Sequence, residues 1–145
     1  MKLPKTVRDR FRAYGRAGGQ ARAANMSPET RRAVARRAAI HRWTRARFGA
    51  ASFEALGLPG GEIIDAGLVA LAGGEESVES LLVSLAAPRF RREGVPIPQD
   101  VFADAEMRLY RLLEQTNGDL AHARFLAYLR QAASFADACA MVRVT

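Results

Sequence analysis

Residues 27–48 form a stretch of arginines and alanines that begins like a helix but offers no wide apolar face. Ser27 can accept hydrogen bonds from the backbone amides of a first helical turn, and Pro28 suits the first helical position. Glu29 places a negative charge near the positive end of the helix dipole. Gly49 is a typical helix stop. The sequence therefore predicts one helix from residue 28 to about residue 48.

Arginines surround most of the circumference of this predicted helix. At about 100° per residue, its few apolar side chains point in three different directions. A helix that is polar on all sides is solvent-bridging, held by ion pairs or lacking its partner, and Glu29 is its only acid. An anionic partner, most simply nucleic acid, explains this pattern; a solvated surface helix is the alternative. The predicted nucleic-acid-binding residues are Arg16, Arg22, Arg31, Arg32, Arg36, Arg37, Arg42, Arg45 and Arg47.

The charge of the chain divides at the end of this stretch. Residues 1–49 hold fourteen Lys/Arg and two acids, a net charge of +12, whereas residues 50–145 have a net charge of −5. Such asymmetry suggests that the basic part contacts a nucleic acid or a membrane surface. We expect two parts: a basic helical nucleic-acid-binding segment, 1–49, and a helical bundle for dimerisation or partner binding, 50–145.

The first residues of the chain are basic with scattered apolar positions, and a short helix is expected over about 6–13. The side chains of Phe11 and Tyr14 can pack on the main body or stack on a base. Gly15, Gly18 and Gly19 follow, and two adjacent glycines cost about 2 kcal/mol of helix propensity relative to alanines. We therefore expect a flexible turn there. A helix, a break and a second, capped helix give a helix-turn-helix-like order.

The acidic part carries the clearest helical periodicity. Helices are predicted over about 62–72, 75–86, 103–115 and 119–141, with Pro88 ending the second. The last has the longest apolar stripe: Ala121, Phe125, Tyr128, Leu129, Ala132, Phe135, Ala136 and Cys139. This stripe is interpreted as a core seam, and part of it, Phe125, Tyr128, Leu129 and Phe135, as a core or partner face. With no alternating strand pattern, the predicted fold class is all-α, a basic arm plus a small helical bundle.

No catalytic motif is recognisable in the chain. One cysteine and two separated histidines do not make a metal-ligand cluster of known spacing, so we expect no metal, no cofactor and no enzymatic activity. Cys139 falls on an apolar face and is expected to be an inert core thiol. No apolar run is long enough to span a bilayer, and no secretory signal is recognisable. We expect a cytoplasmic protein without membrane contact.

Two stretches resemble known bacterial proteins. The segment GRAGGQARAANMSPETRRAVARRAAIHRW resembles a basic segment of small bacterial and plasmid- or phage-associated proteins, with Gly-Gly, Ala-Arg-Ala, a Ser-Pro-Glu cap and a closing Arg-Trp. The segments IIDAGLVALAGGEESVESLLVSLAAPRFRREGVPIP and RLYRLLEQTNGDLAHARFLAYLRQAASF resemble small proteins accompanying nucleotidyltransferase-type toxins of abortive-infection systems. The resemblance implies an antitoxin-like or regulatory partner and identifies no active-site residue.

These observations predict a DNA-binding regulatory protein, an antitoxin-like autoregulator of a toxin–antitoxin or phage-defence module. Its partners would be DNA, a toxin protein and a second copy of the chain in a homodimer. One alternative is a protein-interaction module whose basic arm docks on an acidic protein. Another is an RNA-binding protein. The sequence leaves the target sequence, the cognate toxin and the oligomeric state open.

Overall fold

A computed structural model describes residues 4–142. In this part of the chain every regular element is helical, as predicted, and no strand is present. A short 3-10 turn, Gly118–Leu120, precedes the last helix. The helices are α1 (Lys5–Ala24), α2 (Pro28–Phe48), α3 (Gly61–Ala72), α4 (Val78–Arg92), α5 (Ala105–Asn117) and α6 (Ala121–Val142).

Helix α2 has the predicted ends. The Ser27 hydroxyl accepts a hydrogen bond from the Thr30 amide at 3.1 Å, and Pro28 is the first helical residue. Gly49 adopts a left-handed conformation, with φ at 83°, and its amide bonds to the Arg45 carbonyl at 2.9 Å. The local signals in the sequence are therefore sufficient to delimit this helix.

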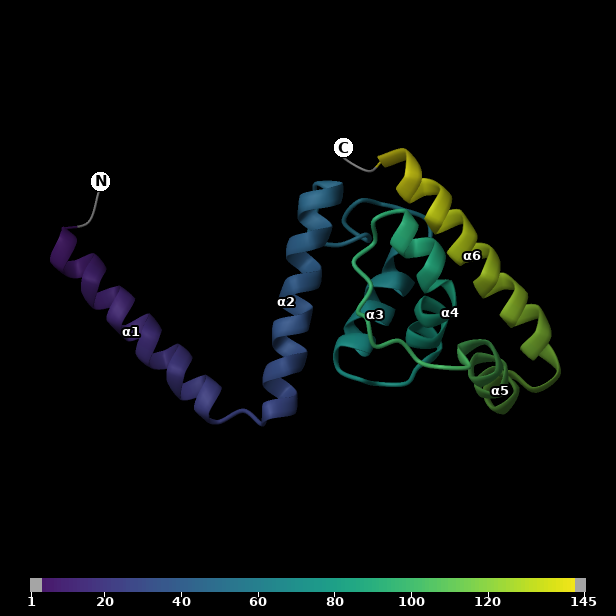
Figure 1. Cartoon of the computed structure of the whole chain (residues 1–145), viewed down its shortest axis with the longest axis horizontal. Helices are drawn as coiled ribbons and strands as arrows, with labels where there is room; N and C mark the ends of the chain where they lie inside the picture. The colour runs from purple at the N-terminus through teal and green to yellow at the C-terminus, as the bar shows by residue number, and fades with distance from the viewer. Residues whose placement is uncertain (1–3, 143–145) are drawn as a thin grey trace.

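The predicted glycine break near the N-terminus is wrong. Helix α1 runs without interruption through Gly15, Gly18 and Gly19, and only Asn25–Ser27 separates it from α2. Arginine and alanine, both strong helix formers, surround the glycines and favour propagation of the helix through them. None of the residues of α1 is buried, and Figure 1 shows α1 extending away from all other helices. The helix-turn-helix-like packing expected of this arm is not confirmed.

The second prediction that the structure corrects is the stop at Pro88. Helix α4 begins at Val78, where Ser77 and Ser80 form a capping box, and it continues past Pro88 to Arg92. Proline removes one backbone hydrogen bond from a helix interior. The following turn is held by Phe90, which is fully buried. Burial of this aromatic ring offsets the bond lost at the proline.

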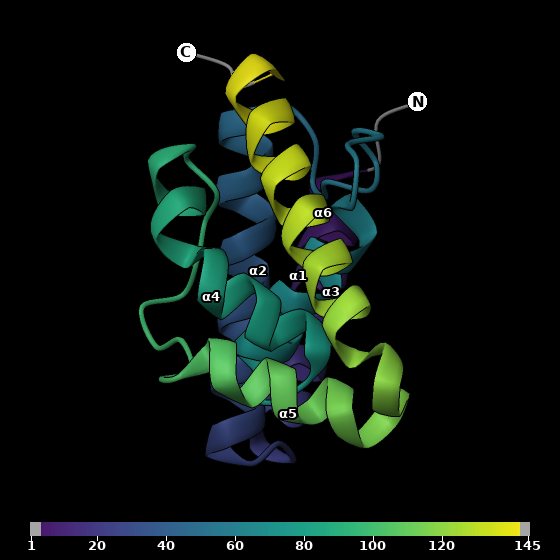
Figure 2. The ribbon, with the colours of Figure 1, turned by 90° about the vertical axis from the view of Figure 1, so that its right-hand side faces the viewer.

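The core lies between α3, α4, α5 and α6, with α2 along one side (Figures 1 and 2). Four phenylalanine rings connect its parts edge to face. Phe53, in the loop after α2, lies 5.1 Å from Phe48 and 4.9 Å from Phe135, and Phe135 lies 5.2 Å from Phe90. Because Phe48 is buried, the C-terminal end of α2 packs with the bundle. The predicted boundary at residue 49 stays a prediction, and both predicted segments extend beyond the described residues.

The apolar stripe of α6 is a core seam, as predicted. Phe125 and Phe135 are buried, and Tyr128 and Leu129 are partly buried against the same core. Ala121, Ala132, Ala136 and Cys139 complete the buried set. The buried side chains therefore belong to the core, whereas Tyr128 and Leu129 keep part of their surface in solvent.

The contact between α3 and α4 depends on one glycine. A Cβ atom added at Gly67 would lie 2.5 Å from the Glu79 carbonyl oxygen and 2.5 Å from Val83 Cγ2. Glycine therefore sets how closely the two helices approach.

We predict that Gly67→Ala lowers the free energy of unfolding by about 1–3 kcal/mol, because backbone must move to admit the methyl group. Denaturant unfolding measures this loss. Gly73→Ala is the matched control, since its Cβ would meet no atom closer than 3.7 Å at a φ of −87°. Equal stability of the two variants would contradict the close packing of α3 on α4.

We also predict that replacing Gly15, Gly18 and Gly19 with alanine stabilises α1. A Cβ at these positions would have no neighbour within 4 Å, and each replacement favours the helix by about 1 kcal/mol. Amide hydrogen exchange over residues 5–24 should become slower, with the exchange of α3 and α4 as the internal reference. Unchanged exchange would mean that α1 is not a continuous helix.

Candidate nucleic-acid interface

Helix α2 has one edge on the bundle and one edge in solvent. Thr44 and Phe48 are buried and Ile40 is partly buried, at intervals of four residues along the helix. The Thr44 hydroxyl donates to the Ile40 carbonyl at 2.8 Å, so its polar atom is satisfied inside the helix. This narrow stripe fixes which arginines face outward.

Arg31, Arg42 and Arg45 lie on the edge of α2 opposite Ile40. All three are exposed, and no partner within residues 4–142 pairs with them. Ala35 and Ala38 lie between them on the same edge. The result is a helix surface with charged side chains at both ends and small side chains between.

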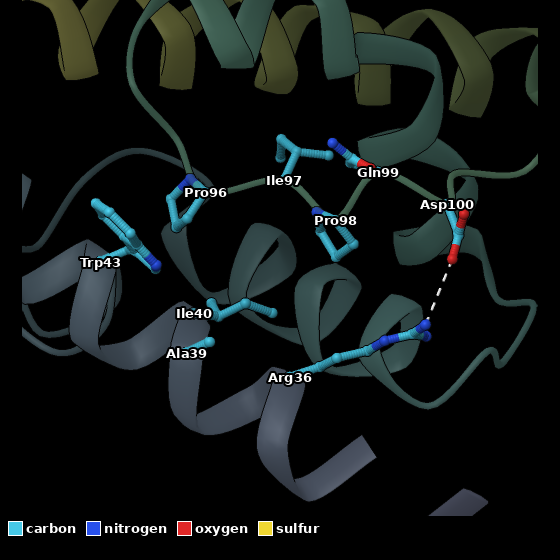
Figure 3. A pocket seen from close by; sticks show the side chains of 9 residues that line it. All are labelled: Arg36, Ala39, Ile40, Trp43, Pro96, Ile97, Pro98, Gln99 and Asp100. Carbon is cyan, nitrogen blue, oxygen red and sulfur yellow. Dashed lines mark hydrogen bonds and ion pairs between the residues drawn. The ribbon is translucent and has the colours of Figure 1, made fainter. Parts of the chain in front are cut away.

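Two of the predicted binding arginines instead hold the chain's own connector, residues 94–100, against α2. Arg36 forms an ion pair of 3.4 Å with Asp100 (Figure 3). Arg47 donates to the Gly94 carbonyl at 3.0 Å and lies over the ring of Trp43, 5.5 Å from its centroid. These arginines clamp the connector at its two ends, which makes them poor candidates for phosphate contacts.

A groove of about 410 Å³ lies between α2 and this connector. Its walls include Ile40 and Trp43 on one side and Pro96 and Ile97 on the other (Figure 3). Trp43 remains 55% exposed. The sequence pattern of α2 gave no indication of this groove, because the connector that forms its second wall lies some fifty residues further along the chain.

The remaining predicted arginines fall into two groups. Arg37 lines a second groove, between α2 and α3, where Glu54 and Glu62 lie nearby. Arg32 is exposed on the flank of α2, and Arg16 and Arg22 are exposed on α1. The structure thus separates the predicted set into a solvent-facing majority and three residues beside other parts of the chain.

Helix α1 adds cations that the prediction left out. Lys5, Arg8, Arg10 and Arg12 are all exposed, and Arg12 lies 3.9 Å from Asp9. They resemble the predicted nucleic-acid-binding arginines in charge and in exposure.

The sequence predicts no metal site and an inert thiol at Cys139. No group of three or more His, Cys, Asp or Glu side chains in residues 4–142 could hold a metal ion. Burial, and secondarily the carboxylate of Glu93, raises the pKa of the Cys139 thiol to about 12. Within the same residues no helix has the length and apolar character needed to cross a bilayer.

We predict that Cys139 resists thiol reagents in the native protein. Because its pKa is raised, the thiolate fraction is small throughout the range below pH 9, and the buried sulfur is inaccessible. Labelling at pH 8 should be slow until denaturant is added. A Cys139→Ser, Met141→Cys variant is the control, since Met141 is 87% exposed and should label at once. Fast labelling of native wild-type protein would contradict the burial.

Comparison of the chain with protein-family models, with curated proteins and with solved structures finds no match.

Proposed function

We propose that this protein binds duplex DNA through the outward edge of α2 and the exposed cations of α1, and that it acts as a regulatory, antitoxin-like protein. The observation that carries the binding proposal is the set of outward arginines of α2. Arg31, Arg42 and Arg45 are exposed and unpaired among the described residues, on a helix whose opposite edge is anchored in a core.

The dimensions of this edge suit a DNA groove. Arg31 and Arg45 are fourteen residues apart, which corresponds to about 21 Å along a helix. The major groove is about 12 Å wide and admits an α-helix. Alanines in the middle of the edge allow close approach, while arginines towards its ends can reach phosphates on both sides. Such contacts position a protein on DNA without specifying a sequence.

The distribution of charge favours one orientation of the protein on DNA. The net charge is +12 over residues 1–49 and −5 over residues 50–145. An acidic bundle is repelled by phosphates, so DNA would be approached from the side of α1 and α2. The bundle would then face away and remain available to a partner.

The regulatory part of the proposal rests on the resemblance of the bundle to small proteins that accompany nucleotidyltransferase-type toxins, and of the basic segment to small plasmid- or phage-associated proteins. An antitoxin of this kind binds its toxin as well as its promoter. The bundle is the part of the chain that would hold such a protein.

We predict that replacing Arg31, Arg42 and Arg45 with alanine weakens binding to all duplexes and reduces the slope of log affinity against log salt by about 2–3. Alanine favours helix, so α2 should remain folded. Fluorescence anisotropy with a labelled duplex at several salt concentrations measures the slope. Arg124→Ala with Arg130→Ala is the matched control, because both arginines are exposed on α6, outside the proposed surface.

Three results would count against the proposal. A wild-type protein without salt-dependent affinity for DNA or RNA at low ionic strength would mean that the basic helices dock on an acidic protein. Tighter binding to single-stranded RNA than to duplex DNA would identify an RNA-binding protein. A triple variant that binds DNA as tightly as the wild type would show that α2 does not supply the phosphate contacts.

A further inference from the structure

Helix α1 carries an apolar face that no other part of residues 4–142 buries. Val7, Phe11 and Tyr14 follow one another at intervals of four and three residues, and Gly18 and Ala21 continue the same face. Phe11 is 65% exposed and Tyr14 is 73% exposed. Two exposed aromatic rings on one helix face indicate a surface that packs against a partner.

The α2–α3 groove offers a complementary surface in the same molecule. It measures about 440 Å³, and its α3 side is formed by the small apolar residues Ala66, Val69 and Ala70. Glu54, Glu62 and Glu75 also line it, all three exposed. None of these glutamates has a partner within the described residues, whereas the Asp65 carboxylate accepts from the Phe53 and Glu54 amides at 3.0 and 2.8 Å. Arg37 lines the groove on its α2 side. The groove is therefore apolar at its base, with one cation on the α2 side and three acids along the rest of its edge.

The charge of α1 is opposite in sign to that of the three acids at the groove. Helix α1 holds six Lys/Arg and one Asp. Arg10 and Arg22 lie on either side of its apolar face, and their twelve-residue separation corresponds to about 18 Å. Glu62 is near the start of α3, whereas Glu75 follows its end and its amide bonds to the Ala70 carbonyl at 2.8 Å. These two acids therefore lie towards opposite ends of the α3 side of the groove.

The turn between α1 and α2 determines whose groove is filled. The Asn25 amide bonds to the Ala21 carbonyl at 3.2 Å, the Met26 amide bonds to the Ala23 carbonyl at 3.3 Å, and Ser27 caps α2. This three-residue turn directs α1 away from the bundle of its own chain (Figure 1). A helix held outward in this way is presented to another molecule.

We propose that two copies of the chain associate by exchanging α1, each placing the face formed by Val7, Phe11 and Tyr14 in the α2–α3 groove of the other. The exchange is reciprocal, so both contacts are equivalent and a closed two-fold dimer results. The proposal does not depend on nucleic-acid binding. The face of α1 that bears Arg12 and Arg16 stays in solvent in this dimer.

Cross-linking by mixed disulfides tests the geometry directly. Phe11→Cys and Val69→Cys proteins are prepared separately, freed of nucleic acid, mixed and oxidised; native Cys139 is buried and does not interfere. We expect a disulfide-linked heterodimer of the two variants. Mixing Phe11→Cys with Leu126→Cys, which alters an exposed residue of α6, is the matched control and should give no comparable product. A Phe11→Cys, Val69→Cys double variant that links only within one chain would overturn the exchange.

Sedimentation of the full chain supplies the energetic test. Phe11→Ser with Tyr14→Ser should raise the dimer dissociation constant about 30-fold or more, as expected for interface anchors. Both side chains are exposed in the single chain, so unfolding is not expected, and circular dichroism checks this. A wild-type chain that remains monomeric at tens of micromolar would overturn the proposal.

Charge reversal identifies the contact partners. Glu62→Arg with Glu75→Arg should weaken the dimer, and adding Arg10→Glu with Arg22→Glu should restore it. Glu114→Arg, an exposed acid of α5, is the control and should leave the dimer unchanged. Failure of the second pair of changes to restore association would show that α1 does not occupy the groove.

Discussion

The chain of four phenylalanine rings is the interaction on which the arrangement of this protein depends. Edge-to-face contacts link Phe48 of α2 through Phe53 to Phe135 of α6 and Phe90 of α4. Aromatic side chains bury large apolar areas and prefer this geometry. Since α2 has almost no other wide apolar contact, the ring of Phe48 is what orients a highly charged helix on the bundle. The same contacts hold the last turn of α4 beyond Pro88.

This anchoring divides the arginines of α2 by task. The arginines near the buried stripe of α2 contact the connector, residues 94–100: Arg36 pairs with Asp100, and Arg47 donates to the Gly94 carbonyl. The Arg36 pair is exposed, and such pairs contribute at most about 1 kcal/mol. The role of this ion pair is to hold the connector beside Trp43 and Ile40. The arginines on the opposite edge have no such task and are the ones available to a polyanion.

The acidic bundle gives both proposals a common electrostatic basis. Like charge keeps the bundle away from phosphates, and unpaired glutamates along the α2–α3 groove attract a basic helix. In an exchanged dimer, α1 would cover these glutamates while its Arg12 and Arg16 stay in solvent. The two proposals are therefore compatible, although each stands on separate contacts.

Local sequence signals determined the helical class, both ends of α2 and the buried stripe of α6. The Ser27-Pro28 start, the Gly49 stop and apolar side chains at helical intervals act within a few residues, so they can be read without the fold. The break predicted at the glycines of α1 is wrong because helix propagation through alanine and arginine outweighs the local cost of glycine.

Only the tertiary structure decided that α4 passes through Pro88, since that depends on the burial of Phe90 against Phe135. It also decided which arginines face solvent. The connector that engages Arg36 and Arg47 lies about fifty to sixty residues further along the chain, and no local pattern specifies a contact over that separation.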